Sequence, residues 1–483
     1  MSFDILKQLI KTPVESVPLS LGHCQAHQIA NLSGHFKEEK VKPFRPGFLF
    51  ATIVFILTLF FAHATTSLLV EEPTLERLKI DLKSSEAKVR KKAATELGKS
   101  RSREAVAPLL SAAQDPDIEV REEVVKSLGL LRDQEAITIL LTTIKDPAES
   151  VREESIIALV NIYVDHDAGF IMTRLARKVY KKINPFSDQV GTDPTVIEHY
   201  VKVGPVVIDS IAERLLDSSP SIQLDAAKAL GILKAQAAIP KMLEAMKTGD
   251  SNLRVATLRS LYKIKDPSVD EQILPYLNVT DNAVRSEAIL TLGLFKSHKA
   301  LPTLQKIYDQ NAGSKLRIKA LQAISLIGDR TSLELFTRNL RDPDSLYRQF
   351  AAEGIARVID GSLVEEVSRA HIKEKKLGTQ LALSFALYRL GRKEYIEKLI
   401  MGLPERMHYE QVTSYFLEMG NPIQFELVKY LNHGDAKVRE RLCYILGLIG
   451  DKSTIDKLKP LLKDPDSNVV SEAALAIRRL GTS

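Results

Sequence analysis

The chain of 483 residues has no tryptophan and only two cysteines, Cys24 and Cys443. Two cysteines cannot build the disulfide framework that holds small secreted domains together. An excess of one charge is also missing, because 67 Lys and Arg face 61 Asp and Glu, for a formal net charge of +6. A dedicated nucleic-acid-binding protein concentrates far more positive charge, so we expect no nucleic acid among the partners.

The short motifs of common enzyme classes are missing as well. The sequence contains no phosphate-binding glycine loop, no Gly-x-Ser-x-Gly elbow, no Cys-x-x-Cys pair and no His-Glu-x-x-His motif. These absences predict a protein without enzymatic activity and without a cofactor.

Four potential metal ligands, His23, Cys24, His27 and His35, lie close together near the amino terminus. Imidazole and thiolate groups bind zinc or copper, but this spacing matches no standard site. A polar tail needs no metal to explain it. We therefore predict no metal site and keep these four residues only as an alternative.

The longest apolar run, residues 48–61, follows a polar arm, residues 1–47, which we expect to be poorly ordered. In one interpretation residues 48–70 form a membrane helix, because 23 residues at 1.5 Å per residue span the ~30 Å hydrocarbon core. In the other, the run is the apolar region of a signal peptide that is cleaved near Ala64.

Both interpretations carry the rest of the chain, residues 71–483, across a membrane. Lysines and an arginine ahead of the apolar run place the amino terminus in the cytoplasm. We therefore expect either a membrane-anchored protein with its larger part outside the cytoplasm or a protein exported to the periplasm.

A pattern of about 31 residues repeats through residues 71–483. Residues 115–133 and 435–451 show it most clearly, since both contain Val-Arg-Glu, then Leu-Gly, then Asp. The position of this Arg recurs at thirteen anchors: Arg90, Arg121, Arg152, Thr192, Gln223, Arg254, Arg285, Arg317, Arg348, Gln380, Val412, Arg439 and Val470. Seven of the twelve intervals are 31 residues, three are 32, one is 40 and one is 27. A near-constant period indicates stacked equivalent units rather than independent domains.

Each unit has the pattern of two helices joined by a short turn. Apolar residues fall at −1, +3, +4 and +7 around the anchor, which is one stripe of a helix with 3.6 residues per turn. An Asp-Pro pair ahead of the anchor breaks the previous helix, its Asp can cap the next, and an Asp at +12 can cap the helix after that. One such pair cannot bury its apolar face alone. The pattern therefore predicts an all-α solenoid, an α-α superhelix of about 13 two-helix repeats.

The motif Asp-Pro-x-x-x-Val-Arg, followed by Leu-Gly and Asp, resembles the HEAT-repeat family in its short form, typical of phycocyanobilin lyases. The resemblance runs from about residue 74 to the end. It implies a ladder of Asp and Arg between units, and so structural roles for these residues: Asp115, Arg121, Asp146, Arg152, Asp342 and Arg348. The ladder should be interrupted at the residues that depart from the motif: Thr192, Gln223, Gln380, Val412 and Val470. Di-iron hydroxylases built on this repeat carry paired His-Glu dipeptides, and the chain contains no such dipeptide.

The regular spacing fails in two places. The 40-residue interval predicts a surface loop at residues 184–193, ahead of an inner helix near residues 194–203. Residues 380–438 hold degenerate repeats that are rich in Phe and Tyr. Large aromatic side chains fill uneven gaps between irregular units, although they are also common in binding surfaces. We favour the first explanation.

Positions +1 and +2 after the anchor line the concave face in this architecture. The early ones are acidic and the middle ones apolar, and they supply the candidate partner-binding residues: Glu122, Glu123, Glu153, Glu154, Leu224, Asp225, Val255, Glu287, Ile318, Phe350 and Leu381. Apolar residues where a solvated helix has polar groups indicate a groove for an apolar or helical segment. The alternative is lateral packing against the adjacent inner helix.

Together these features predict a scaffold or adaptor that binds other proteins on the extracytoplasmic side of a membrane. An alternative is a lyase-like or chaperone-lyase protein that handles a cofactor in the concave groove. Nucleic-acid binding is a third alternative, which the charge balance disfavours.

Overall fold

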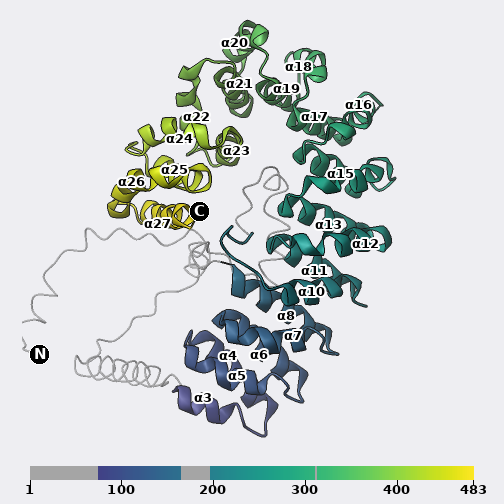
Figure 1. Cartoon of the computed structure of the whole chain (residues 1–483), viewed down its shortest axis with the longest axis vertical. Helices are drawn as coiled ribbons and strands as arrows, with labels where there is room; N and C mark the ends of the chain where they lie inside the picture. The colour runs from purple at the N-terminus through teal and green to yellow at the C-terminus, as the bar shows by residue number, and fades with distance from the viewer. Residues whose placement is uncertain (1–73, 165–195, 311–312, 483) are drawn as a thin grey trace, which may run out of the picture. The chain divides into compact units, whose positions relative to one another are not determined.

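Pairs of helices joined by short turns make up the coloured ribbon in Figure 1. This computed structural model describes residues 74–164, 196–310 and 313–482, which belong to one compact unit, Pro73–Ser483. The described residues form helices and turns and contain no strand. The predicted all-α fold is therefore confirmed.

One helix of each pair packs against the equivalent helix of the next pair, so that a row of inner helices runs through the unit. The inner helices are α4 (Ala87–Lys99), α6 (Ile118–Leu131), α8 (Glu149–Tyr163), α11 (Pro220–Ile232), α13 (Ser251–Ile264), α15 (Asn282–Leu294), α17 (Lys315–Ile327), α19 (Ser345–Val358), α21 (Leu377–Arg389), α23 (Tyr409–Met419), α25 (Ala436–Ile449) and α27 (Ser467–Gly481). The outer helices are α3 (Leu75–Asp81), α5 (Val106–Ala112), α7 (Ile137–Thr143), α10 (Pro205–Glu213), α12 (Ile239–Thr248), α14 (Asp270–Ile273), α16 (Leu301–Gln310), α18 (Leu333–Asn339), α20 (Val364–Lys373), α22 (Ile396–Gly402), α24 (Gln424–Leu427) and α26 (Ile455–Leu458).

Aspartates begin many of these helices. Asp117 accepts hydrogen bonds from the backbone N–H groups of Glu119 and Val120 and so caps α6. The Asp of the preceding Asp-Pro pair, Asp115, accepts instead from the backbone N–H of Asp117. The cap therefore lies two residues after the position that the motif predicted. The predicted Asp at +12 does begin the next turn, as Asp133 shows.

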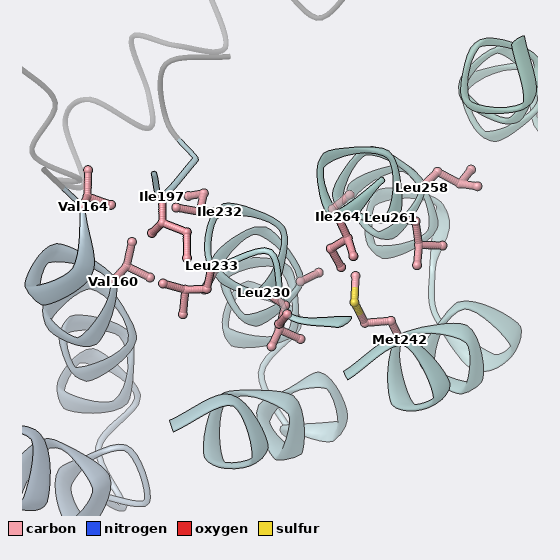
Figure 2. Close-up of a cluster of buried hydrophobic side chains, with 14 of the residues drawn as sticks. Val160, Val164, Ile197, Leu230, Ile232, Leu233, Met242, Leu258, Leu261 and Ile264 are labelled. Atoms are coloured by element: carbon pink, nitrogen blue, oxygen red, sulfur yellow. The ribbon is translucent and has the colours of Figure 1, made fainter. Parts of the chain in front are cut away.

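Apolar side chains between neighbouring pairs form a continuous core, part of which is drawn in Figure 2. In that view Val160 of α8 and Val164, which directly follows α8, face Ile197 and Leu233, next to α11, and Leu261 of α13 continues the cluster. All five are at most 5% exposed. Burying one such side chain stabilises a fold by about 1.5–3 kcal/mol, so each pair depends on its neighbours.

Glycines let the inner helices approach closely. A Cβ atom added to Gly129 of α6 would lie 2.8 Å from the Cα atom of Ala158 in α8, and Gly447 of α25 stands in the same relation to Ala476 of α27. Real Cβ contacts are not that short. The Leu-Gly step of the repeat motif is therefore explained by helix packing rather than by a turn.

The repeat predicted at Thr192 has no inner helix at the expected place. Residues 196–204 have no regular secondary structure, and the loop predicted at residues 184–193 lies outside the described residues. Helix α11 packs directly against α8, and Arg152 of α8 pairs with Asp217 ahead of α11. The 40-residue interval thus belongs to an insertion between two adjacent repeats, so twelve inner helices follow one another in the described residues.

Helices continue through the degenerate residues 380–438, from α21 to α25. Phe385 and Phe416 are fully buried there, and the ring of Phe385 stacks on that of Tyr415 with 4.2 Å between centroids. These rings fill space between irregular units, as the favoured explanation predicted. Phe425 differs, since it is 62% exposed.

The predicted arm, residues 1–47, and the predicted membrane helix or signal peptide, residues 48–70 with Ala64, lie outside the described residues. Their boundaries, and the start of the repeats at residue 71, stay predictions. Among the residues that the structure does describe, no helix is long and apolar enough to cross a membrane. This finding contradicts the predicted membrane anchoring, and the predicted export has no support either, so we withdraw that location.

Candidate partner-binding face

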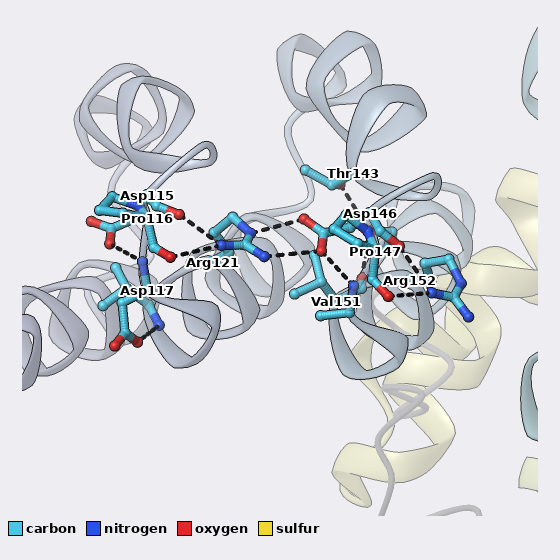
Figure 3. A network of polar contacts seen from close by, with 12 residues as sticks. Asp115, Pro116, Asp117, Arg121, Thr143, Asp146, Pro147, Val151 and Arg152 are labelled. Atoms are coloured by element: carbon cyan, nitrogen blue, oxygen red, sulfur yellow. Dashed lines mark hydrogen bonds and ion pairs between the residues drawn. The ribbon is translucent and has the colours of Figure 1, made fainter.

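A ladder of arginine and carboxylate groups joins successive repeats, as Figure 3 shows for Arg121. Its Nε and Nη2 atoms donate to the carboxylate of Asp146, at 2.8 and 3.0 Å. Its Nη1 atom donates to the carbonyl oxygens of Asp115 and Pro116, at 2.8 and 3.2 Å. One guanidinium thus ties its own repeat to the next through a two-pronged contact.

The same arrangement recurs along the unit, where the carboxylate partner always comes from the following repeat. The pairs are Arg90 with Asp115, Arg121 with Asp146, Arg152 with Asp217, Arg348 with Glu374 and Arg439 with Asp464. Burial by itself would raise the pKa of Asp115, but hydrogen bonds from Arg90 and from a backbone N–H hold that pKa below its ordinary value. These residues are structural, as the resemblance implied, and they are not available to a partner.

Two details of the ladder differ from the expectation. Asp342 accepts from the backbone N–H of Asp344, and the carboxylate that holds Arg348 is that of Glu374, which the motif did not identify. Gln380 keeps one part of the arginine's role, because its side-chain amide donates to the carbonyl oxygen of Glu374 at 2.6 Å. A Gln in place of Arg therefore preserves the contact within a repeat.

The acidic positions of the predicted concave face are engaged within the chain. Glu123 lies 3.3 Å from Lys126, Asp225 lies 3.7 Å from Lys228, and Glu287 lies 3.0 Å from Arg259. Asp225 is only 1% exposed. The predicted acidic stripe is therefore largely neutralised by neighbouring cations. Its remaining members, Glu122, Glu153 and Glu154, also interact with other groups, and only the first two are half-buried rather than buried.

The apolar positions divide into two sets. Phe350 is 6% exposed and Leu381 is 2% exposed, so both belong to the core between repeats. Leu224, Val255 and Ile318 are half-buried and pack against that core with part of their surface open. Lateral packing thus accounts for the first set, and the second set remains a candidate surface on α11, α13 and α17.

A buried polar cluster in the later repeats was not predicted from the sequence. Arg357 of α19 donates through Nε to Glu418 of α23 at 2.9 Å, and through Nη1 to the hydroxyl of Ser325 at 2.9 Å. The hydroxyl of Tyr415 donates to Glu353 at 2.6 Å, and Glu353 lies 3.7 Å from Arg357. We name Ser325, Glu353, Arg357, Tyr415 and Glu418 the polar cluster. It joins helices that are not consecutive in the row, since α21 lies between α19 and α23 in the chain.

The charges of the polar cluster are balanced locally. Burial by itself would raise the pKa of Glu418, but Arg357, with help from Lys296, holds that pKa below its ordinary value. Burial and the neighbouring Glu353 raise the pKa of Tyr415 well above its ordinary value, so its hydroxyl stays a hydrogen-bond donor. Every member thus has a partner, which is the condition for a stable buried ion pair.

A metal site is not found among the residues that the structure describes. No group of three or more His, Cys, Asp and Glu side chains there is arranged to hold a metal ion. The alternative metal ligands His23, Cys24, His27 and His35 lie outside the described residues. The cofactor alternative in the concave groove likewise gains no supporting residue.

Comparison with known proteins identifies two relatives. Deoxyhypusine hydroxylase-B of Oryza sativa subsp. japonica is 25% identical over 232 residues, which are 46% of this chain and 75% of the rice protein. Deoxyhypusine hydroxylase of Arabidopsis thaliana is 24% identical over 218 residues, which are 44% of this chain and 68% of the plant protein. Both relatives are enzymes by name. They contradict the prediction that this protein is not an enzyme, because repeats of this kind also occur in proteins with catalytic activity.

Solved structures with similar helical arrangements share little sequence. An engineered protein is 18% identical, with a TM-score of 0.34, and covers 84% of this chain and 98% of its own. Human deoxyhypusine hydroxylase in complex with glycerol is 19% identical, with a TM-score of 0.24 over 52% of this chain and 84% of its own. A chain in the structure of Kap95p bound to RanGDP is 13% identical, with a TM-score of 0.42 over 84% of this chain and 55% of its own.

The family is shown by the sequence pattern of HEAT repeats. That pattern matches residues 75–160, 208–282, 250–325, 271–356 and 426–483, which together cover more than half of the chain. The matched stretches contain paired helices, steps of the arginine ladder and the closely packed glycines Gly129 and Gly447. The chain belongs to the HEAT-repeat family.

Proposed function

We propose that the protein is a scaffold that binds other proteins along its inner helices. The observation that carries the proposal is the row of HEAT repeats, a type of solenoid that commonly binds proteins. The surface is the column of half-buried +1 positions: Glu122, Glu153, Leu224, Val255 and Ile318. We name these five residues the inner column.

The composition of the inner column supports a partner that is in part apolar. Leu224, Val255 and Ile318 keep some surface open although they lie on helices whose remaining apolar residues are buried. Half-buried apolar side chains flanked by polar groups are typical of the centre and rim of a protein interface. Phe350, Leu381 and the paired acids of the original prediction are left out, because the chain itself already covers or pairs them.

A site-specific crosslinking experiment tests this face. A photoreactive amino acid placed at Val255 or Ile318 of the full chain should crosslink to a defined polypeptide in cells that make the protein. The same group at Val206, which is 63% exposed on the outer helix α10, is the matched control. Crosslinks of equal yield at the outer position, or none at the inner one, would defeat the proposal.

Substitutions provide the second measurement. Val255→Glu and Ile318→Glu should reduce recovery of that polypeptide at least tenfold while the melting temperature changes by less than a few degrees. Val206→Glu should leave recovery unchanged. Partner recovery that survives both inner substitutions in a folded chain would also count against the inner column.

A second candidate function, an enzyme related to the hydroxylases, is favoured by the two relatives from rice and Arabidopsis. The residues present do not fit the paired His-Glu pattern of di-iron hydroxylases, and the described part offers no metal cluster. We therefore derive no reaction step. Metal analysis of the purified full chain decides the matter: iron at one or more equivalents supports an enzyme, and a metal-free chain that does not take up iron ends this candidate.

A further inference from the structure

After eight of the twelve inner helices, α4, α6, α11, α13, α15, α17, α19 and α21, the residue eleven positions after the anchor has a left-handed backbone conformation. In the earlier repeats this residue is basic, with φ of 52° at Arg101, 56° at Arg132, 47° at Lys234, 62° at Lys265 and 54° at Lys296. In the later repeats it is Gly328 with φ of 67°, Ile359 with 58° and Gly391 with 102°. The backbone requirement is thus shared, and the side chain changes from one half of the unit to the other.

Glycine is the residue that this conformation favours, because an L-residue brings its Cβ atom close to the following carbonyl oxygen. Lysine or arginine there is strained by comparison. A cation does interact favourably with the carboxyl end of a helix, and this is the purely structural explanation of the pattern. That explanation does not account for the later repeats, whose inner helices end with the same dipole and use Gly328 or Gly391.

Three of these cations follow consecutive inner helices, α11, α13 and α15, which Figure 1 shows next to one another in that order. We name Lys234, Lys265 and Lys296 the basic row. Lys265 and Lys296 are exposed and Lys234 is half-buried. Burial lowers the pKa of Lys234 and the nearby charge of Lys265 lowers it further, so the two ammonium groups repel each other. Such repulsion is relieved when an anion binds between or across them.

Among the described residues the basic row is only partly neutralised. No salt bridge of Lys234 or Lys265 is found among the described residues, although the charge of Glu198 acts to raise the pKa of Lys234. Lys296 lies 3.6 Å from Glu418, but that carboxylate is held more closely by Arg357 at 2.9 Å. The ammonium groups of the basic row therefore retain positive charge that can attract a ligand outside the chain.

We propose that the basic row binds an extended acidic segment of a partner protein. The inference rests on the proposed scaffold function and specifies the chemistry of one partner segment. Neighbouring helices pack about 8–10 Å apart, and an extended chain advances about 3.3 Å per residue, so one repeat corresponds to about three residues. An Asp or Glu at every third position of the segment would meet one lysine each.

Nucleic acid fits the basic row less well than such a segment. Glu198 lies near Lys234 and Glu418 lies near Lys296, so carboxylates interrupt the positive field at both ends of the row. A phosphate backbone needs continuous positive charge, whereas spaced carboxylates need only spaced cations. The regular spacing of one cation per repeat suits the second case.

The probe is a fluorescein-labelled peptide of four Glu-Pro-Pro units, whose polyproline helix has three residues per turn and about 3.1 Å per residue. All its glutamates therefore lie on one edge, about one repeat apart. Binding to the full chain is followed by fluorescence anisotropy at low salt. The triple variant Lys234→Gln, Lys265→Gln and Lys296→Gln should bind this peptide at least tenfold more weakly than the parent chain does. The charge-matched control changes Lys241, Lys247 and Lys306, on the outer helices α12 and α16, to Gln and should bind as the parent does.

A glycine version separates the two explanations. Lys234→Gly, Lys265→Gly and Lys296→Gly should lose peptide binding yet keep or raise the melting temperature, since glycine suits the left-handed position. A lower melting temperature with unchanged peptide binding would show that the row is structural. Equal binding of a peptide with its four glutamates in one block would overturn the spacing argument.

Three further outcomes separate the basic row from its alternatives and from the inner column. Tighter binding of an oligonucleotide than of the peptide, lost in the Gln variant, would assign the row to nucleic acid. No peptide binding, combined with crosslinks at Val255, would leave the scaffold function standing and remove the basic row from it. Peptide binding without crosslinks at the inner column would support the basic row and count against the inner column as the partner-binding face.

Discussion

The later repeats share the arginine ladder with the earlier ones and add a second kind of link. From α4 to α11, each arginine of the ladder contacts its own repeat and the next, as Arg90, Arg121 and Arg152 do. Around α17 to α23, the polar cluster links repeats that are not neighbours, because Arg357 reaches Glu418 over 61 positions of the sequence. The first arrangement is that of a one-dimensional stack, in which stability is a sum over adjacent repeats. The second couples three repeats into one cooperative segment, so we expect the later half to open as a block and the earlier half repeat by repeat.

The largest expected effect comes from breaking the polar cluster. Arg357→Met leaves Glu418 and Glu353 buried without their cation, and removing one partner of a buried ion pair costs about 3–5 kcal/mol. Hydrogen exchange should show loss of protection in α19, α21 and α23 together, with α4 to α8 unchanged. The double variant Arg357→Met with Glu418→Met should recover part of the lost stability. Loss of protection confined to α19 would contradict the cooperative segment.

A smaller effect is expected from Gly129→Ala in the earlier half. The new methyl group would lie 2.8 Å from Ala158, and such overpacking costs about 1–3 kcal/mol. Exchange should increase in α6 and α8 only, because the stack transmits strain to neighbours. Gly361→Ala is the control, since its Cβ atom would have no atom within 4 Å. A cooperative loss of all the earlier helices would remove the contrast between the halves.

Loosening one step of the ladder should have a more modest effect. Arg121→Gln gives up the carboxylate of Asp146 but can keep a carbonyl contact, as Gln380 does naturally. We expect a loss of about 1–2 kcal/mol, typical of a hydrogen bond to a charged group, measured as a shift of the thermal or urea midpoint. Arg103→Gln is the control, because Arg103 is 77% exposed, and it should leave the midpoint unchanged. Equal midpoint shifts for the two variants would contradict the structural role of the ladder.

Low pH is expected to destabilise the later repeats through one buried carboxylate, that of Glu418, and this effect is smaller than those of the substitutions above. The folded pKa of Glu418 lies below its ordinary value of 4.5, so its contribution is complete above that pH and is lost as pH falls through the lower folded value. Stability of α19 to α23 should therefore decline below about pH 4.5. Glu418→Gln should flatten this part of the pH dependence, measured by exchange or by melting temperature. A decline of equal steepness in the Gln variant would show that other carboxylates are responsible.

The smallest signal comes from the thiol of Cys443 on α25. Burial raises its pKa to about 12, so in a Cys24→Ser background the folded protein should react with iodoacetamide far more slowly than a free thiol at pH 8. Labelling then reports local opening. Arg439→Gln on the same helix should speed labelling, whereas Arg121→Gln in the earlier half should not. Faster labelling in both variants would show that the ladder acts over long distances.

Much of the local structure was predictable because it repeats. A stripe of apolar residues with a 3.6-residue period and aspartates ahead of each helix recur often enough to identify the paired helices and their ladder. The failures lie where one copy departs from the others. The sequence between the anchors Arg152 and Gln223 is longer than one period by about one repeat, which predicts a further repeat at Thr192. In the structure α11 packs directly on α8 instead. Glu374 is not predicted by the motif, because it accepts the hydrogen bond from Arg348 at a position where the motif has Asp, one methylene shorter.

The sequence by itself determined the repeat, its period and its membership of an all-α family, because these follow from spacing along the chain. Only the tertiary structure decided which side chains remain available. Leu381 occupies the same register as Val255, yet contact with neighbouring helices buries Leu381 and leaves Val255 half open. The polar cluster and the basic row also appear only in three dimensions. The first depends on the distance between helices two steps apart, and the second on backbone angles that a sequence does not display.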